Sequence, residues 1–263
     1  MIIEMHSHTA EHSECSYVSA AELVKRAFQV GMQAIVLTDH HYLWDEEELE
    51  QLRKKSGVPE IFSILSGQEV TTRDFGDILL YGARKTYKKQ TITLAEIRKQ
   101  DPDAAIVWAH PYRNKRTPTR EQLMSPMINA VEIFNSNHTI LEASNALKDW
   151  HTFKFTAIGG TDTHAFSYTG SYPTIFDHPV HSMDELVEEI KAGRCRPFFK
   201  EIPRAGTTNT KVTEVTIGPK QAEKRKKLII KTFDDIDAWK SGERSFHIVK
   251  ELVQQGFENG TYR

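Results

Sequence analysis

The sequence predicts an α/β fold in which parallel strands and crossover helices form a barrel of the (β/α) kind. Short apolar runs alternate with amphipathic segments along most of the chain, a pattern typical of parallel strands joined by helices. Seven such runs fall within about the first 200 of the 263 residues, and this number points towards a barrel. After Pro197 the alternation stops.

Four strands and two helices are expected in the first part of the barrel. Residues 2–5 form the first apolar run. Ser19 and Glu22 have the spacing of a capping box, which predicts that a helix begins there. The charged segment EEELEQLRKK predicts a second, exposed helix. The other three strands are expected at residues 34–37, 61–65 and 78–82.

The second part of the barrel continues the alternation. Thr93 and Glu96 form another capping box, and Ser182 and Glu185 form one at the start of the last helix. A further helix is expected at residues 139–151. The remaining strands are expected at residues 105–109, 130–134 and 156–160.

Two regions are therefore expected, a barrel at residues 1–200 and a C-terminal appendage at residues 201–263. The appendage begins with a Thr- and Gly-rich stretch and continues as a charged helical pattern that we expect to pack on the barrel. Its basic run EKRKK is typical of a solvated helix face, and a nucleic-acid patch is the weaker interpretation.

The composition predicts a soluble globular protein. Hydrophobic residues make up 39% and charged residues 27%, and the net charge of −2 gives no strong signal for nucleic acid or a membrane surface. Cys15 and Cys195 are the only cysteines, which excludes a disulfide framework and fits a reducing compartment. The apolar runs are too short to span a bilayer, and no signal-peptide pattern is present. We expect a cytoplasmic protein, and the sequence does not indicate its oligomeric state.

Side chains that can bind metal ions stand at the ends of nearly all the expected strands. In chain order they are His6 and His8, then the segment TDHH at 38–41, Glu69, Asp77, His110, Asn135 and Asn137, and the segment GTDTH at 160–164. Because the carboxyl ends of the strands of a parallel barrel open on one face, these side chains are expected to converge.

Each of these residues alone has an ordinary structural explanation. A single histidine beside a strand is more often a hydrogen-bonded structural residue, and a buried acid is more often a cap or an ion-pair partner. Crowding buried carboxylates and imidazoles together is costly unless divalent cations take them as ligands. The coincidence of these residue types therefore predicts a metal centre. His12 and His41 lie beside the candidates and fit either a supporting or a substrate-binding role.

The ordered motifs HSH, TDHH, QEV, AHP and GTDTH resemble those of the PHP (polymerase and histidinol phosphatase) family over roughly residues 1–200. The resemblance implies a distorted (β/α)7 TIM-like barrel that holds two or three divalent metal ions. It also implies that His6, His8, Glu69 and Asp162 hold one metal, that Glu69 bridges to a second metal shared with His110, and that His40 and His164 hold a third.

Two positions depart from the family pattern. Family members commonly carry an acid seven positions after the first histidine, where this chain has Ser13. We therefore expect Glu14 to supply the carboxylate for the third metal. Many members have histidine where this chain has Asp77, and an oxygen ligand there would shift the metal preference and leave one site weak or empty.

A centre of imidazoles and carboxylates suits phosphoester hydrolysis, because paired metals lower the pKa of a bridging water and polarise phosphoryl oxygens. We expect Glu69 to set the metal spacing and Asp162 to orient the hydroxide. Arg113 is a candidate phosphate ligand, although a surface role fits it nearly as well, and His41 is a second candidate substrate contact. The predicted function is a phosphatase or phosphodiesterase that uses Zn, Mn or Fe and acts on a small phosphorylated metabolite or nucleotide.

Two other functions remain open. A metal-dependent amidohydrolase or deaminase would also use His-x-His after its first strand. Those barrels usually bridge their metals with a modified lysine, and no lysine stands beside these motifs. A regulatory or nuclease-accessory module with a structural metal is the other alternative, and the full ligand set disfavours it. No Gly-rich phosphate loop is present.

Overall fold

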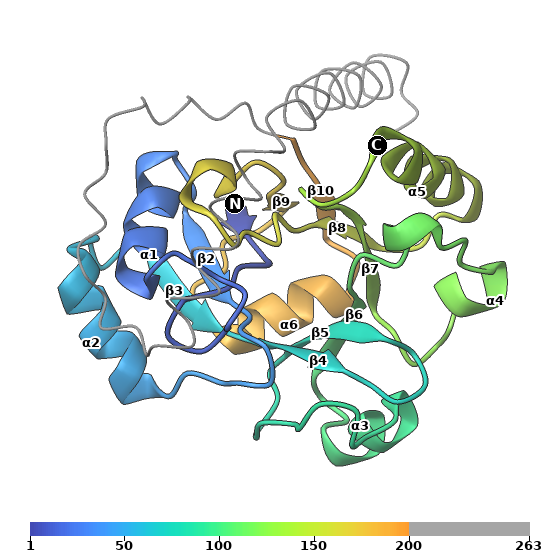
Figure 1. Ribbon diagram of the computed structural model, residues 1–263, viewed down its shortest axis with the longest axis horizontal. Coiled ribbons are helices and arrows are strands. Elements are labelled where there is room, and N and C mark those ends of the chain that lie inside the picture. Colours follow the sequence, from blue (N-terminus) through green and yellow to red (C-terminus); the bar gives the residue numbers. More distant parts are fainter. Residues whose placement is uncertain (200–263) are drawn as a thin grey trace.

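The structure is a computed structural model that describes residues 1–199 (Figure 1). The expected appendage, residues 201–263, lies outside the described residues. Within them, ten strands form two five-stranded sheets with helices packed around them. None of the described helices is long and apolar enough to cross a membrane.

The first sheet has the order β10-β9-β1-β2-β3, and the motifs HSH and TDHH follow two of its strands. Its strands are β1 (Ile2–Glu4), β2 (Ala34–Leu37), β3 (Ser63–Ser66), β9 (Thr174–Phe176) and β10 (Cys195–Pro197). β1, β2 and β3 are parallel, as expected, whereas β9 runs antiparallel to both β1 and β10. The carboxyl ends of β1 and β2 therefore lie side by side.

The second sheet has the order β4-β5-β6-β7-β8. Its strands are β4 (Gln68–Thr71), β5 (Asp77–Tyr81), β6 (Ala105–Trp108), β7 (Ala130–Phe134) and β8 (Ala157–Gly159). β6, β7 and β8 are parallel, but β5 is antiparallel to both of its neighbours.

The expectation of an all-parallel sheet is therefore wrong at β5, and β4 is a strand that the sequence did not predict. Only a short turn ending at Gly76 joins β4 to β5, and a parallel connection needs a much longer crossover. Glu69 consequently lies on a strand rather than after one. The reversal also brings the first residue of β5, Asp77, to the same end of the molecule as the carboxyl ends of the parallel strands.

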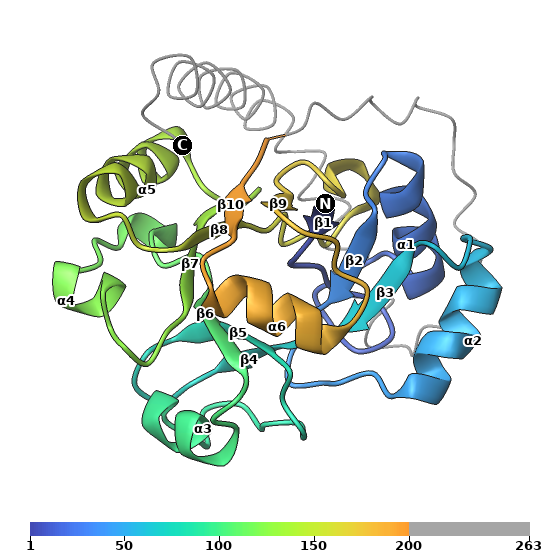
Figure 2. The same cartoon turned by 180° about the vertical axis from the view of Figure 1, so that it is seen from behind.

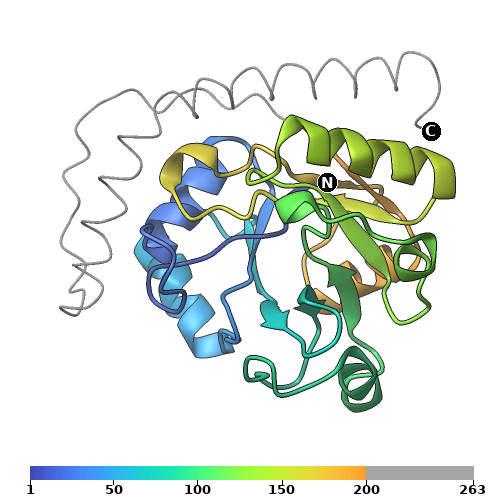
Figure 3. The same ribbon diagram turned by 45° about the vertical axis from the view of Figure 1, so that its right-hand side comes forward.

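The expected helices form with the expected caps. They are α1 (Ala20–Gln29), α2 (Glu46–Ser56), α3 (Leu94–Gln100), α5 (Ile140–Phe153) and α6 (Met183–Lys191), and a short α4 (Arg120–Leu123) joins them. The capping boxes of α3 and α6 are present, and the Ser19 side chain accepts from the backbone of Glu22 at the start of α1. Figures 2 and 3 show α1 and α2 beside the first sheet and α5 and α6 beside the second.

The two sheets share one aliphatic core. Met5, which follows β1, and Val36 of β2 pack in the same buried cluster as Leu79, Val107 and Ile158 of the second sheet. Each such fully buried side chain contributes roughly 1.5–3 kcal/mol through removal of apolar surface from water. Isolated bridges between Ser7 and Thr163 and between His40 and Glu69 join the sheets at the end where the histidine motifs lie. This packing holds the two halves of the candidate site together.

Candidate metal centre

The His-x-His pair lies directly after β1, and both of its imidazoles are fully buried. Ser7 between them faces the other way, because its hydroxyl donates to the carbonyl of Val36 at 2.9 Å. Alternate residues of an extended segment share a face. As a result, His6 Nε2 and His8 Nε2 point at each other across only 3.0 Å.

Asp162, which follows β8, completes the first group of potential ligand atoms. Its Oδ1 lies 3.5 Å from His6 Nε2 and 3.2 Å from His8 Nε2. The ligand atoms of these three residues all lie within 4.8 Å of one another. The other oxygen of Asp162 accepts from Asn137 Nδ2 at 2.8 Å and faces Arg113 Nη1 at 3.4 Å, so the carboxylate is held from both sides.

Glu69 is the most connected side chain of the centre. Its Oε1 lies 3.0 Å from His110 Nε2. Its Oε2 lies 3.0 Å from His40 Nδ1, 3.2 Å from His8 Nε2 and 3.5 Å from His6 Nε2. His6, Glu69 and His110 form the second group of ligand atoms within 4.8 Å. One carboxylate thus reaches four imidazoles, as a metal-bridging ligand would.

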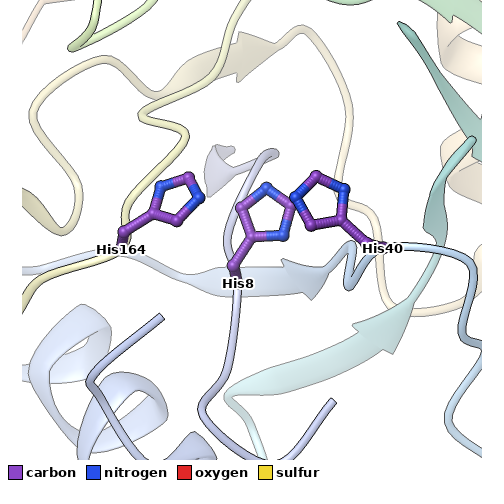
Figure 4. A group of neighbouring side chains, drawn as sticks. All are labelled: His8, His40 and His164. Carbon is purple, nitrogen blue, oxygen red and sulfur yellow. The ribbon is translucent and has the colours of Figure 1, made fainter. Parts of the chain in front are cut away.

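The third group consists of imidazoles alone, namely His8, His40 and His164 (Figure 4). The ring centres of His40 and His164 lie 4.4 Å and 4.6 Å from that of His8. His8 is buried, whereas the other two rings are partly open to solvent. This group therefore forms the accessible edge of the centre.

Seven of the nine ligands predicted from the sequence belong to these three groups. The two others, Glu14 and Asp77, line the adjoining cavity and lie outside the groups that the described residues form. Their roles as ligands remain predictions. Arg113 and His41, the predicted substrate contacts, line the same cavity.

Sequence reasoning missed Glu132, a fully buried carboxylate in β7. It accepts from His6 Nδ1 and from the backbone N–H of His110, both at 2.8 Å, and from Asn135 Nδ2 at 3.0 Å. Because a carboxylate only accepts, the neutral form of His6 that can bind a metal would carry its proton on Nδ1 and direct the lone pair of Nε2 into the centre. The available signal was an acid in the middle of the apolar run AVEIF.

Asp39 and Ser13 organise the loop that follows the His-x-His pair. Asp39 is fully buried and accepts from the backbone of Thr9 at 2.7 Å, from Ser13 Oγ at 2.6 Å and from Trp44 Nε1 at 2.8 Å. Ser13 Oγ also lies 3.3 Å from His8 Nδ1. Ser13, the residue at the family's acidic position, is thus a buried part of this hydrogen-bond network.

Three residues in the centre or in the adjoining cavity have left-handed backbone conformations although none is glycine. They are His41 (φ 56°), His110 (φ 31°) and Asp162 (φ 52°). Each such conformation costs on the order of 1–3 kcal/mol and persists only where the surrounding structure imposes it. Their concentration at one site fits a centre whose ligand directions are set by the fold.

The charges of the centre are strongly coupled. Burial disfavours a charge on His6, but the carboxylates of Glu132, Asp162 and Glu69 outweigh it and raise the pKa of His6 well above its usual value. For Glu69, burial favours the neutral acid, but His6, His110 and His40 outweigh it and hold its pKa well below the usual range. Protonated imidazoles balance these carboxylates, and divalent cations would balance them as well. The donor set therefore fits metal ions.

A cavity of about 770 Å³ adjoins the centre. Glu69, His110 and Asp162 line its inner part, and the cationic side chains Lys89 and Arg116 line it together with Arg113. Cys15 also faces it. Burial raises the pKa of this thiol, but His164 and His40 outweigh that effect and lower it to about 6. The cavity offers anion-binding groups directly beside the ligand cluster.

Two solved structures share the fold at low sequence identity. PsfC from Pseudomonas syringae PB-5123 superposes with a TM-score of 0.59 at 14% identity, covering 76% of this chain and 91% of that one. A two-domain protein from Bacteroides vulgatus ATCC 8482, containing a predicted PHP-like metal-dependent phosphoesterase, gives 0.57 at 19% identity. That match covers 76% of this chain and 64% of the other. At these identities the likeness concerns the mixed α/β fold.

Comparison with curated proteins found no match. Comparison with family models matched the PHP domain over residues 4–145 and a PHP-associated region over residues 145–195. The first match includes the two motifs at the ends of β1 and β2, together with Glu69 and His110. The chain belongs to the PHP domain family.

Proposed function

We propose that this protein is a metal-dependent phosphoesterase that hydrolyses a small phosphorylated metabolite or nucleotide with two or three divalent ions of Zn, Mn or Fe. Membership of the PHP family supports a hydrolytic enzyme. The observation that carries the proposal is the environment of Glu69, whose two oxygens reach four imidazoles beside a cavity lined by cations. Such a carboxylate can hold two ions at a short separation.

Each residue of the centre has a proposed role in binding the metal ions, in orienting a ligand or in positioning water. Paired divalent ions supply a nucleophilic water at neutral pH and stabilise charge on phosphoryl oxygens. Glu132 keeps the Nε2 lone pair of His6 directed inward. Asn137 and Arg113 engage one oxygen of Asp162, which leaves the other facing His6 and His8. Asp162 is therefore placed to orient a water between the ligands and the cavity.

The cations of the cavity favour an anionic substrate. Lys89, Arg113 and Arg116 line the cavity together with the acids Glu14 and Asp77, and guanidinium groups match phosphate oxygens in pairs. A neutral amide carries no charge for these cations to bind, so they favour a phosphate ester as substrate. No lysine stands beside the sequence motifs that supply the ligand groups, where a bridging modified lysine would be needed.

The proposal extends to the architecture of the centre. The distorted (β/α)7 barrel is supported by the core that both sheets share and by the bridges that join them near the centre. In this arrangement residues 1–200 form the catalytic domain and residues 201–263 the appendage. A barrel mouth formed by both sheets accounts for the convergence of residues that are far apart in sequence.

The test is a parallel assay of the full-length protein after metal analysis. Phosphomonoesters, phosphodiesters and anilides are offered with added Zn, Mn or Fe. We expect at least two ions per chain and turnover of one class of phosphate ester, lost on chelation and restored by metal. Turnover of anilides but not phosphate esters would identify an amidohydrolase instead. A metal content below one per chain, unchanged by added Zn or Mn, would overturn the metal centre itself.

A further inference from the structure

The loop after His8 carries a second histidine, His12, which belongs to none of the three ligand groups that the described residues form. His12 lines the cavity beside the centre, and 22% of its side chain is exposed. The next residue, Ser13, ties the loop to the third group. Its Oγ accepts from the backbone N–H of His40 at 3.1 Å and lies 3.3 Å from His8 Nδ1. His12 therefore forms part of the cavity wall next to the third group.

His12 forms an aromatic cluster with Tyr42 and Trp44. Its imidazole stacks on Tyr42, with the ring centres 3.5 Å apart and the planes 10° from parallel. Trp44 is nearly perpendicular to both rings, and its centre lies 4.6 Å from that of His12 and 6.2 Å from that of Tyr42. These three distances place Trp44 to the side of the stack, beside the edge of the imidazole. The face of His12 that is turned away from Tyr42 is therefore covered by neither ring.

Hydrogen bonds hold the two supporting rings of the aromatic cluster in place. Tyr42 Oη donates to Glu48 Oε1, in the first turn of α2, at 2.6 Å. Trp44 Nε1 donates to the buried carboxylate of Asp39 at 2.8 Å, and the backbone N–H of Trp44 donates to Ser66 Oγ at 2.8 Å. The imidazole thus has a fixed support, so a planar group that stacks on its other face requires little further ordering of the protein.

The cavity has room for more than a phosphate group. Its volume of about 770 Å³ is in the range of sites for whole small molecules. Of the three rings of the aromatic cluster, only His12 lines this cavity. An ester whose phosphate is bound at the ligand groups and the cations would therefore place its alcohol part in a space that has an imidazole in its wall. Flat aromatic faces favour stacking with other planar rings.

We infer that His12 is a specificity-determining residue that stacks against a planar aromatic ring in the alcohol part of the substrate. The inference rests on the proposed function and narrows its substrate class to phosphate esters that carry such a ring, as nucleotides do, in preference to sugar phosphates. Every base has a face that can stack on an aromatic side chain. His12 would therefore select for the presence of a ring rather than for one particular base.

Adenosine 5′-monophosphate (AMP) and ribose 5-phosphate are the pair of substrates that tests the inference. Both carry a phosphate on the same primary alcohol of the same sugar, and only AMP carries a base. The full-length, metal-loaded protein is assayed with each ester. We expect kcat/KM for AMP to exceed that for ribose 5-phosphate by at least about fivefold, the lower end of what a base gains by stacking on an aromatic side chain. The difference should lie mainly in KM.

Two substitutions of His12 show whether its ring causes the preference. His12→Ala should remove most of the preference for AMP. His12→Phe should keep it, because phenylalanine retains a planar ring that can stack on Tyr42. His181→Ala is the matched control, because His181 is exposed and does not line the cavity, and it should keep the wild-type ratio. Circular dichroism confirms that all three variants are folded.

The possible outcomes separate the stacking site from the proposed function. A wild-type ratio near one would overturn the stacking site and leave phosphoester hydrolysis standing. A preference that survives in His12→Ala, or is lost in His12→Phe, would do the same and would assign the aromatic cluster to packing alone. If neither ester is turned over, calorimetric binding of AMP and ribose 5-phosphate makes the same comparison. Tighter binding of AMP that depends on His12 then supports the stacking site without turnover, and equal or absent binding overturns it.

Discussion

At the scale of single residues, Glu69 is the side chain on which most of the centre depends. Its two oxygens lie 3.0–3.5 Å from the ring nitrogens of His6, His8, His40 and His110. An amide of the same shape keeps one oxygen but loses the negative charge that balances two cations. Glu69 lies in β4, the hairpin strand at the edge of the second sheet, and the pairing of β4 with β5 holds that charge in place.

We expect Glu69→Gln to abolish hydrolysis and leave the fold intact. The neutral amide cannot balance two ions, so metal content and activity fall together while the melting curve remains cooperative. Steady-state rates and metal analysis of the purified variant measure both effects. A variant that keeps more than about a tenth of the wild-type kcat/KM, a loss below about 1.4 kcal/mol, would remove Glu69 from the bridging role.

Glu132→Gln tests whether the hydrogen bond between His6 Nδ1 and Glu132 fixes the tautomer of His6. The amide NH2 of glutamine can donate to Nδ1 of His6, which would move the imidazole proton to Nε2 and block the lone pair that faces the centre. We expect metal affinity to fall by about 10–100-fold, the usual effect of losing a partner that orients a ligand. Calorimetric Zn titration measures the change.

Glu189→Gln is the matched control for that variant. Glu189 is also a buried acid, but it lies in α6 and pairs with Arg194 and His178. Its substitution is expected to lower the melting temperature and leave Zn affinity unchanged. Equal Zn affinities for Glu132→Gln and the wild type would show that Glu132 serves only to fill and hydrogen-bond the core.

At the scale of secondary-structure elements, the centre depends on how closely β8 approaches β1. Gly160 follows β8, and a Cβ at this position would meet Glu132 Oε1 and lie 2.6 Å from the Cβ of His6. Real Cβ atoms do not tolerate such contacts. The glycine is therefore required by the close approach of two elements rather than by backbone conformation.

We expect Gly160→Ala to displace Glu132 and His6 and to lower metal affinity as well as stability. Gly57→Ala is an informative comparison, because Gly57 ends α2 at φ 68° with open space around it. Its substitution costs on the order of 1 kcal/mol of backbone strain without touching the centre. Thermal melts and Zn titrations of both variants distinguish the two effects. Normal Zn affinity in Gly160→Ala would show that the strands can separate without harm to the ligands.

Much of this element structure was predictable because local signals agree with the tertiary fold. Thr93 and Glu96 mark the start of α3, and the apolar run at 105–109 becomes β6. The hairpin of β4 and β5 was not predictable from apolar periodicity, since QEVT is a polar sequence held by its pairing with β5. Glu132 was missed for the opposite reason. Its run is so apolar that the strand was evident, and only the fold shows that its acid faces the histidines.

At the scale of the whole molecule, protons and metal ions compete for the same buried negative charge. Carboxylates raise the pKa of His6 well above its usual value despite its burial. At His40, Cys15 and the Glu69 carboxylate together outweigh burial and raise the pKa to about 10. A histidine whose pKa is raised by folding stabilises the folded chain fully below its unfolded pKa of about 6.5. That stability is lost as the pH rises through the higher folded value.

The raised pKa values of His6, His8 and His110 should therefore make the metal-free protein lose stability as the pH rises above about 6.5. His40 adds a loss that extends to about pH 10, and the lowered pKa of Cys15 offsets this part up to about pH 9. The metal-loaded protein should not lose stability in this way, because bound cations replace the protons. At an ion concentration 100 times the dissociation constant, binding adds about 2.7 kcal/mol to the stability of the folded protein. Metal affinity rises with pH because fewer protons must be displaced.

We expect the increase in melting temperature on adding Zn to the chelator-treated protein to be larger at pH 8 than at pH 6. Thermal melts with and without Zn at both values test this, with the Glu69→Gln variant as the control in which the increase is small at either pH. An increase that is equal at the two pH values in the wild type would mean that the histidines of the centre are already neutral without metal.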